Sequence, residues 1–181
     1  FLKDVGAPGA WVPGTPGVNG VAVSAPFDGA LHLPAPSGAW YLKQCSLSAS
    51  VLCVPQLIDL LWYNTGLVVT TTTEQTFTTP TFPARDVNGA TNGAGCMIGL
   101  YWTAASTNAG VIAGTTVRYT STVGANRTAT LVATAGNQIP ITPVIGTIVW
   151  FNLQAGDSDV LSIQGITLAT SLATGSISLF L

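Results

Sequence analysis

The strongest structural signal in this chain is the alternation of apolar and small polar residues at its C-terminal end. In residues 176–181, isoleucine and leucine at the odd positions alternate with serine at positions 176 and 178. Successive side chains of a β-strand point to opposite faces, so this period of two predicts a strand with one buried face. We therefore expect the last third of the chain, residues 116–181, to form β-sheet.

A second stretch keeps the period of two but changes its phase. Leu161 and Ile163 place apolar side chains at odd positions. Ile166 and Leu168 place them at even positions, and Gly165 stands at the change. A β-bulge inserts one extra residue into a strand, and a glycine inside a strand often marks one. The pattern therefore predicts a bulge at Gly165.

Similar patterns divide much of the remaining chain into short strands. Strands are expected at residues 47–53, 67–77, 97–104, 116–120, 127–132, 149–153, 160–168 and 176–181. The spacing of residues 116–120 and 127–132 predicts a hairpin. Residues 79–96 are expected to form a long loop with Asn-Gly turns, whereas residues 56–63 fit a strand or a helical turn. Together these features predict an all-β domain over residues 39–181, a jelly-roll-like antiparallel β-sandwich of about eight strands.

Residues 1–38 differ from this pattern. They contain six of the 11 prolines and seven of the 20 glycines. Proline lacks a backbone N–H, so the segment is unsuited to a helix or a central strand. It also contains Trp11, Val12 and Phe27, apolar residues that disordered linkers usually lack. We therefore expect an extended Pro/Gly-rich N-terminal arm that becomes ordered against a neighbouring subunit, with these three residues as interface candidates.

Charged residues are scarce along the whole chain. They make up 7% of it and give a formal net charge of −2, whereas an average protein has about 25%. None occurs in residues 5–27, 87–117, 128–156 or 160–181. Because the cores of protein interfaces are depleted of charge, we expect other subunits to cover much of the surface. The alternative is a monomer kept soluble by its 25 threonines and 12 serines.

The same scarcity of charge argues against two classes of partner. A chain with so few cations offers little attraction to the phosphates of a nucleic acid or to an anionic membrane. No stretch approaches the roughly 20 consecutive apolar residues of a membrane-spanning helix. We therefore expect neither nucleic acid nor a membrane as a partner.

No combination of residues predicts a reactive centre. His32 is the single histidine and lies in the Pro-rich arm, where a packed or solvent-facing role is favoured over catalysis. Seven carboxylates could include a glycosidase pair, but a chain so poor in charge has little with which to tune their pKa values. Asp157 and Asp159 fit turn capping better than calcium binding. We therefore expect no enzymatic activity, no cofactor and no metal.

The three cysteines are Cys45, Cys53 and Cys96. Their apolar surroundings favour buried, reduced thiols. A disulfide between the first two is an alternative that no pattern supports. Without a C-x-x-C motif, a zinc site is not expected.

Aromatic residues occur in adjacent pairs that suggest a second interpretation. These pairs are Trp40-Tyr41, Trp62-Tyr63 and Tyr101-Trp102. Rings on one face of a sandwich could stack on a sugar, but neighbours in a strand point to opposite faces, so each pair supplies one ring to a given face. Core packing and subunit interfaces explain the rings equally well.

Several stretches resemble a known group of proteins. They are Phe82-Pro83-Ala84-Arg85-Asp86 before the Asn-Gly loop, Val117-Arg118-Tyr119-Thr120 with Arg127-Thr128-Ala129-Thr130 across the turn, and LQAGDSDVLSIQGITL at 153–168 with GSISLFL at 175–181. Over about residues 40–181 the chain resembles small virion proteins of tailed bacteriophages, of the head decoration or cement type. The resemblance implies a β-sandwich subunit, homotrimeric, that binds the major capsid protein on the outside of an icosahedral capsid assembled in the host cytoplasm. It carries over no catalytic residue.

The sequence-based hypothesis is therefore a non-enzymatic virion protein that stabilises a phage capsid by bridging its subunits. Arg85, Arg118 and Arg127 are candidates for directed contacts, because arginine can bind a carboxylate through two hydrogen bonds. Internal ion pairs and solvated strand ends are the alternatives for these three residues. The alternative functions are a neck, tail or fibre-attachment virion protein and a carbohydrate-binding β-sandwich module.

Overall fold

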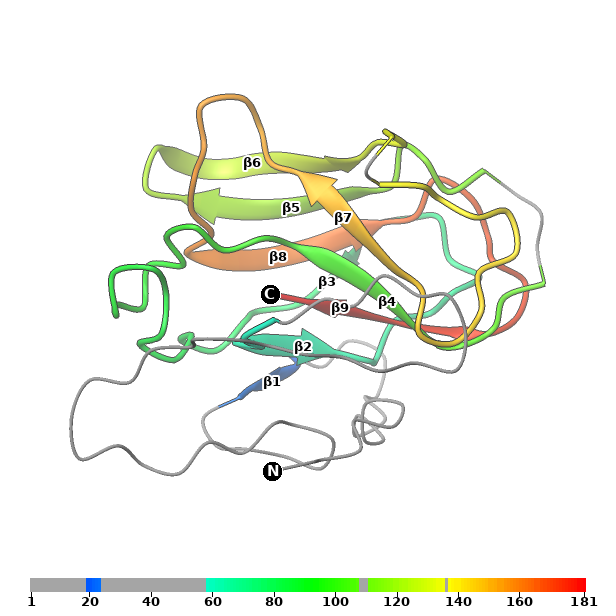
Figure 1. The fold of residues 1–181 in the computed structure, drawn as a ribbon, viewed down its shortest axis with the longest axis horizontal. Helices are drawn as coiled ribbons and strands as arrows, with labels where there is room; N and C mark the ends of the chain where they lie inside the picture. The colour runs from blue at the N-terminus through cyan, green and yellow to red at the C-terminus, as the bar shows by residue number, and fades with distance from the viewer. Residues whose placement is uncertain (1–18, 24–57, 108–110, 136) are drawn as a thin grey trace.

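A computed structural model describes residues 19–23, 58–107, 111–135 and 137–181, and these residues form an all-β fold without a helix (Figure 1). The strands are β1 (Val21–Ala22), β2 (Trp62–Asn64), β3 (Gln75–Thr76), β4 (Gly99–Ala104), β5 (Thr116–Ser121), β6 (Gly124–Leu131), β7 (Ile148–Asn152), β8 (Ser162–Thr167) and β9 (Ser176–Phe180). The count of nine is close to the expected eight. The all-β class is therefore confirmed. The strand predicted at residues 47–53 lies outside the described residues.

All strand pairs are antiparallel, and the strand order is β1-β2-β9-β4-β7-β6-β5-β8-β3. The sheet curls into two facing layers (Figure 1). We call β1, β2, β9 and β4 layer A, and β6, β5, β8 and β3 layer B. Strand β7 joins them, because Ile148, Val149 and Trp150 pair with β4 whereas Phe151 and Asn152 pair with β6. The result is the expected sandwich-like arrangement, made from one continuous sheet.

The two outer edges of this curled sheet are brought together by Asn19. Its side-chain Oδ1 accepts a hydrogen bond from the backbone N–H of Thr78, just after β3, at 2.9 Å. Its backbone oxygen accepts one from the indole N–H of Trp62 in β2 at 3.0 Å. Both edge strands, β1 and β3, are only two residues long. Short edges limit unwanted strand pairing with other chains.

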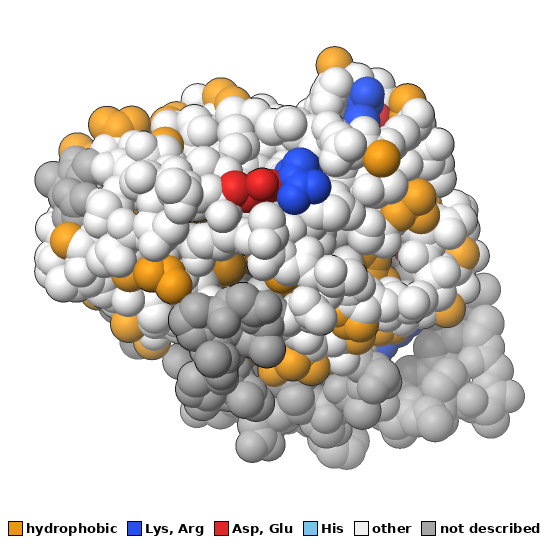
Figure 2. All heavy atoms as spheres, turned by 180° about the vertical axis from the view of Figure 1, so that it is seen from behind, with side chains coloured by type: hydrophobic (Ala, Val, Ile, Leu, Met, Phe, Trp, Pro, Cys, Tyr) orange, Lys and Arg blue, Asp and Glu red, His pale blue; other side chains and the backbone are white. Residues whose placement is uncertain are grey.

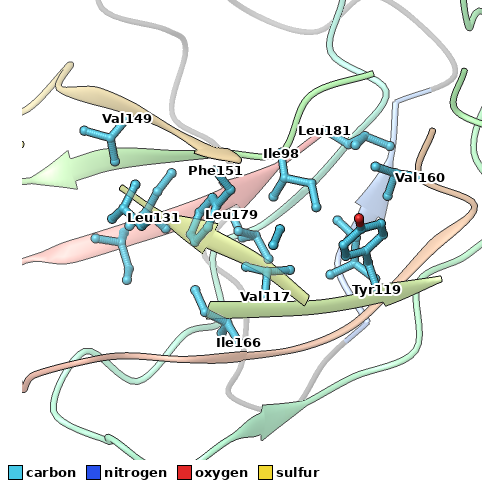
Figure 3. Close-up of a cluster of buried hydrophobic side chains, with 14 of the residues drawn as sticks. Ile98, Val117, Tyr119, Leu131, Val149, Phe151, Val160, Ile166, Leu179 and Leu181 are labelled. Atoms are coloured by element: carbon cyan, nitrogen blue, oxygen red, sulfur yellow. The ribbon is translucent and has the colours of Figure 1, made fainter. Parts of the chain in front are cut away.

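The main hydrophobic core lies between the two layers, and their side chains point toward one another (Figure 3). Layer B contributes Val117, Leu131 and Ile166, which are fully buried. Leu179 from layer A faces them, and Tyr119 lies toward one end of the core. The alternation along the strands thus places one set of side chains inside the sandwich.

Strand β9 departs from the expectation of a single buried face. Ser178 and Phe180 are 0% and 2% exposed, so both faces of the strand are buried. Phe180 belongs to a second apolar cluster on the outer face of layer A, formed by Val23, Leu60, Tyr63, Tyr101 and Phe180, with Ile148 and Trp150 against it. The one-face prediction was wrong because this outer cluster covers the second face of β9.

The bulge predicted at Gly165 is confirmed. Arg118 of β5 pairs with Gly165 of β8, but the next residue, Tyr119, pairs with Ile163. Gln164 is therefore the extra residue, and the shift lets Ile163 and Ile166 both face the core. The hairpin is also confirmed, since β5 and β6 pair directly across a short turn.

The strand predicted at residues 67–77 is wrong over most of its length. Only Gln75–Thr76 forms a strand there. The amide side chain of Gln75 accepts a hydrogen bond from the N–H of Val68 at 2.7 Å and donates one to its carbonyl at 2.9 Å. A side chain thus takes the place of a neighbouring strand. β-Branched residues do not form a strand unless a neighbouring strand is present to pair with them.

Candidate functional site

Two of the three predicted arginines form ion pairs at the surface with carboxylates of the same chain. Arg118, on β5, donates from Nε to Glu74 Oε1 at 2.6 Å. Arg85 donates from Nε to Asp59 at 3.1 Å and from Nη2 to the carbonyl of Leu60 at 2.9 Å. The face seen in Figure 2 carries mostly uncharged side chains. Both pairs are partly exposed, so their contact role remains a prediction.

The third arginine forms a more buried pair. Arg127 donates from Nε and Nη2 to the two carboxylate oxygens of Asp157, each at 2.8 Å, and the Asp157 side chain is 0% exposed. The hydroxyl of Tyr119 also donates to Asp157 and accepts a hydrogen bond from the N–H of Gln154 at 3.0 Å. Arg127 thus binds a carboxylate with two hydrogen bonds, as expected, but the carboxylate belongs to the same chain.

These contacts set the ionisation of the groups involved. The hydrogen bond from Arg127 is the largest cause that lowers the pKa of Asp157 below its usual 3.8. Burial, followed by the bond to Asp157, raises the pKa of Tyr119 to about 12. At neutral pH the network therefore contains a carboxylate, a guanidinium and a neutral phenol. It joins β5 and β6 to the connection between β7 and β8.

Asp159 supports the hairpin next to this network. Its Oδ1 accepts a hydrogen bond from the N–H of Thr122 in the β5–β6 turn at 2.8 Å, and the Thr122 hydroxyl donates to its other oxygen. The prediction that Asp157 and Asp159 cap the turn of their own connection was wrong, because Asp159 caps the distant β5–β6 turn and Asp157 pairs with Arg127.

Asp86 organises the long loop at residues 79–96. Its carboxylate accepts hydrogen bonds from the backbone N–H groups of Asn88 at 2.9 Å, Ala90 at 2.7 Å and Ala94 at 3.1 Å. The bond from Ala90 is the largest of the effects that lower its pKa. This role was not predicted from the sequence, although an aspartate two residues before an Asn-Gly turn was the available signal.

The Asp86 loop forms one wall of a pocket at the outer face of layer A. The pocket has a volume of about 270 Å³. Its lining includes Ile58, Asp59, Leu61, Arg85, Asp86, Val87, Ala94, Gly95, Cys96, Met97, Trp150, Phe180 and Leu181. Three of these side chains are unusually exposed for their type, namely Ile58 at 42%, Val87 at 78% and Met97 at 53%. We call these three residues and the Arg85–Asp59 pair the pocket rim.

The side chains that line the pocket suit the binding of an apolar group. Cys96 is a free, half-buried thiol, and burial raises its pKa, followed by the charges of Asp86 and Asp59. The protonated thiol is a poor nucleophile. Asp86 is occupied by backbone N–H groups, as described above. The exposed apolar side chains can receive an apolar group, and the methionine can adapt to its shape.

Other predicted residues fall outside the described part of the chain or inside the core. The residues outside it are Trp11, Val12, Phe27, His32, Trp40, Tyr41, Cys45 and Cys53. Trp62 and Trp102 are both 0% exposed, so neither ring can stack on a sugar in this fold. Their partners Tyr63 and Tyr101 lie on the opposite face, in the outer cluster, as the alternation predicts.

The described residues offer neither a metal site nor a membrane-spanning helix. Within the described residues, no three His, Cys, Asp or Glu side chains gather where a metal ion could bind. No helix in that part of the chain has the length and hydropathy to cross a membrane. No protein-family model, no curated protein and no solved structure matches the chain.

Proposed function

We propose that this chain is a virion structural protein that binds the outside of a phage capsid and stabilises it by bridging capsid subunits. The proposal starts from the sequence resemblance to head decoration proteins. The observation that supports it best is the pocket rim, where large apolar side chains are exposed beside a single ion pair. Such a surface suits contact with another protein, because exposed apolar patches commonly mark interaction sites.

The physical requirements of a capsid fit a subunit of this kind. A capsid lattice repeats the same contact many times, and subunits that bind through several contacts at once are retained even when each contact is weak. In this proposal the chain forms a homotrimer, and each copy places its pocket rim against the major capsid protein. The N-terminal residues Trp11, Val12 and Phe27 are proposed to add a second contact.

The first experiment is to measure the copy number of the chain in purified particles, by quantitative mass spectrometry against the major capsid protein. A ratio near parity, or a simple lattice fraction, is the expected result. A ratio far below this would favour the alternative of a neck, tail or fibre-attachment protein. Absence from particles would overturn the proposal.

A variant tests the pocket rim itself. Val87→Glu places a charge on the rim, and the cost of desolvating it should lower capsid occupancy by about tenfold or more. The matched control is Val123→Glu on the β5–β6 turn, because that valine is also exposed, at 62% against 78% for Val87. Occupancy can be measured by sedimenting stripped capsids with each variant. Equal binding by the two variants would remove the pocket rim from the contact.

A further inference from the structure

Three connections at one end of the sandwich contain no charged residue. The described parts of these three connections, residues 105–107 with 111–115, 132–135 with 137–147, and 168–175, meet at this end (Figure 1). None of these residues is Asp, Glu, Lys, Arg or His. Three long charge-free runs of the sequence thus converge in space, although they are far apart along the chain. A fourth connection at that end, residues 65–74, packs against them through a hydrogen bond from the N–H of Leu172 to the carbonyl of Val69, and it contains one charged residue, Glu74, which is paired with Arg118.

The same end exposes several large aliphatic side chains. They are Val111 at 73%, Val132 at 40%, Ile141 at 65%, Val144 at 61% and Ile145 at 57% exposed. We call these five residues the aliphatic end. Single exposed aliphatics are common on protein surfaces, but five on adjoining connections without any charge are a feature of interaction sites.

The connection between β6 and β7 is ordered by hydrogen bonds. The N–H of Thr147 donates to the carbonyl of Val144 at 3.0 Å, which closes a turn, and the N–H of Gly146 donates to the carbonyl of Trp102 at 3.0 Å. Gly146 has a φ of 87°, which glycine adopts without strain. The N–H of Ser106 donates to the carbonyl of Pro143 at 3.1 Å. Val144 and Ile145 are therefore held in place before any partner binds, which reduces the entropy lost on binding.

Neighbouring connections are linked in the same way. The hydroxyls of Thr107 and Thr174 lie 2.6 Å apart, and the N–H of Ala169 donates to the hydroxyl of Thr115 at 3.1 Å. These bonds join the β4–β5 connection to the β8–β9 connection without a charged group. Hydrogen bonds between backbone and hydroxyl groups therefore hold together the connections that carry the aliphatic end.

Several charged groups lie at the opposite end of the sandwich. Arg127, Asp157 and Asp159 support the β5–β6 turn there, as described above. The distribution matters for self-association, because two identical surfaces carry the same charge, so a charged patch repels its own copy. An uncharged patch has no such repulsion. It also offers no charge complementarity by which to select a different protein.

We propose that the aliphatic end is the contact surface between copies of this chain. Closed assemblies of identical subunits use the same patches on every copy, and the aliphatic end supplies such a patch without like charges. This inference concerns the isolated chain and holds or fails independently of capsid binding, because it is measured without capsids.

Sedimentation velocity on the full-length chain tests the proposal, over concentrations up to about 100 µM. The wild type is expected to form an oligomer. Val144→Glu should raise its dissociation constant by about tenfold or more, and Ile145→Glu should do the same. Val123→Glu at the opposite end is the matched control, since Val123 and Val144 are 62% and 61% exposed. Circular dichroism and urea unfolding of each variant confirm that the fold is retained.

Three results would overturn the inference. The first is a wild type that stays monomeric over the whole concentration range. The second is an oligomer that neither Val144→Glu nor Ile145→Glu weakens. The third is an equal loss of association in Val123→Glu, because the added net charge, and not its position, would then explain the weaker association. A chain that is absent from virions but oligomerises through this end would sustain the inference and overturn only the proposed function.

Discussion

At the scale of single residues, the buried carboxylates of Asp86 and Asp157 serve as anchors for connecting segments. Asp86 gathers the N–H groups of its own loop, whereas Asp157 is held by Arg127 and Tyr119 from the hairpin. Buried carboxylates are costly unless hydrogen bonds replace their water. Here the bonds are complete enough to lower the pKa of both groups.

These lowered pKa values predict a stability that is lost in acid. The unfolded carboxylates titrate near 3.8 and the folded ones lower, so at acidic pH the unfolded state binds more protons than the folded state. Their contribution is fully present above the unfolded pKa and disappears as the pH falls through the folded pKa. Urea unfolding between neutral pH and about pH 2.5 should therefore show a falling free energy of unfolding below about pH 4.

Asp157→Asn separates this effect from general acid denaturation. The variant keeps the side-chain shape but not the charge, so it should be less stable at neutral pH and lose less stability in acid than the wild type. Glu74 is a useful control position, because it is a surface carboxylate paired with Arg118. If Asp157→Asn and Glu74→Gln changed the loss of unfolding free energy at acidic pH equally, the buried Arg127–Asp157 pair would not be the cause of that loss.

At the scale of elements, a single glycine in strand β8 allows strand β3 to pack closely against it. A Cβ atom at Gly165 would lie 2.8 Å from Glu74 Oε1 and 3.0 Å from the backbone oxygen of Gln75. Glycine therefore allows the short edge strand β3 to approach the bulge closely. Arg118 holds Glu74 at 2.6 Å, so that side chain cannot move away without losing its ion pair.

Gly165→Ala should destabilise the fold by about 1–3 kcal/mol, because the added methyl group forces β3 away from β8. The matched control is Gly124→Ala in β6, where a Cβ would meet nothing within 4 Å, and its effect should stay within about 0.5 kcal/mol. The two midpoints of urea unfolding provide the comparison. Equal midpoints would mean that β8 accommodates the methyl group without displacing β3.

At the scale of the whole molecule, the described residues carry few charged groups, and these groups are unevenly distributed. Each arginine of the described residues has a carboxylate partner in its own chain. The aliphatic end has no charged residue, and the pocket rim has one exposed pair. Contacts made through such surfaces depend on apolar burial, which salt does not screen.

Both proposed contacts, between copies of this chain and with a capsid, should therefore resist salt. We expect self-association and capsid binding to be unchanged or stronger in about 1 M NaCl than at about 0.1 M, where screening lengths are roughly 3 and 10 Å. Sedimentation at the two salt concentrations measures both. Release by high salt would show that ion pairs between chains, made by residues such as Arg85, carry the binding.

Much of the fold was predictable from local pattern, since alternation is a property of neighbouring residues. The phase change around Gly165 predicted the bulge, and the spacing around the β5–β6 turn predicted the hairpin. The strand predicted at residues 67–77 was mostly wrong for a physical reason. A strand needs a partner strand, and the composition of a segment does not say whether a partner is present. The burial of both faces of β9 depended in the same way on its neighbours.

The sequence by itself determined the all-β class, the positions of most strands in its last third and the absence of charge over long runs. Only the tertiary structure decided that Arg127 pairs with Asp157, 30 residues away, and that three charge-free runs meet at one end of the sandwich. Local pattern follows from the geometry of adjacent residues, whereas these contacts follow from the order in which the strands pair.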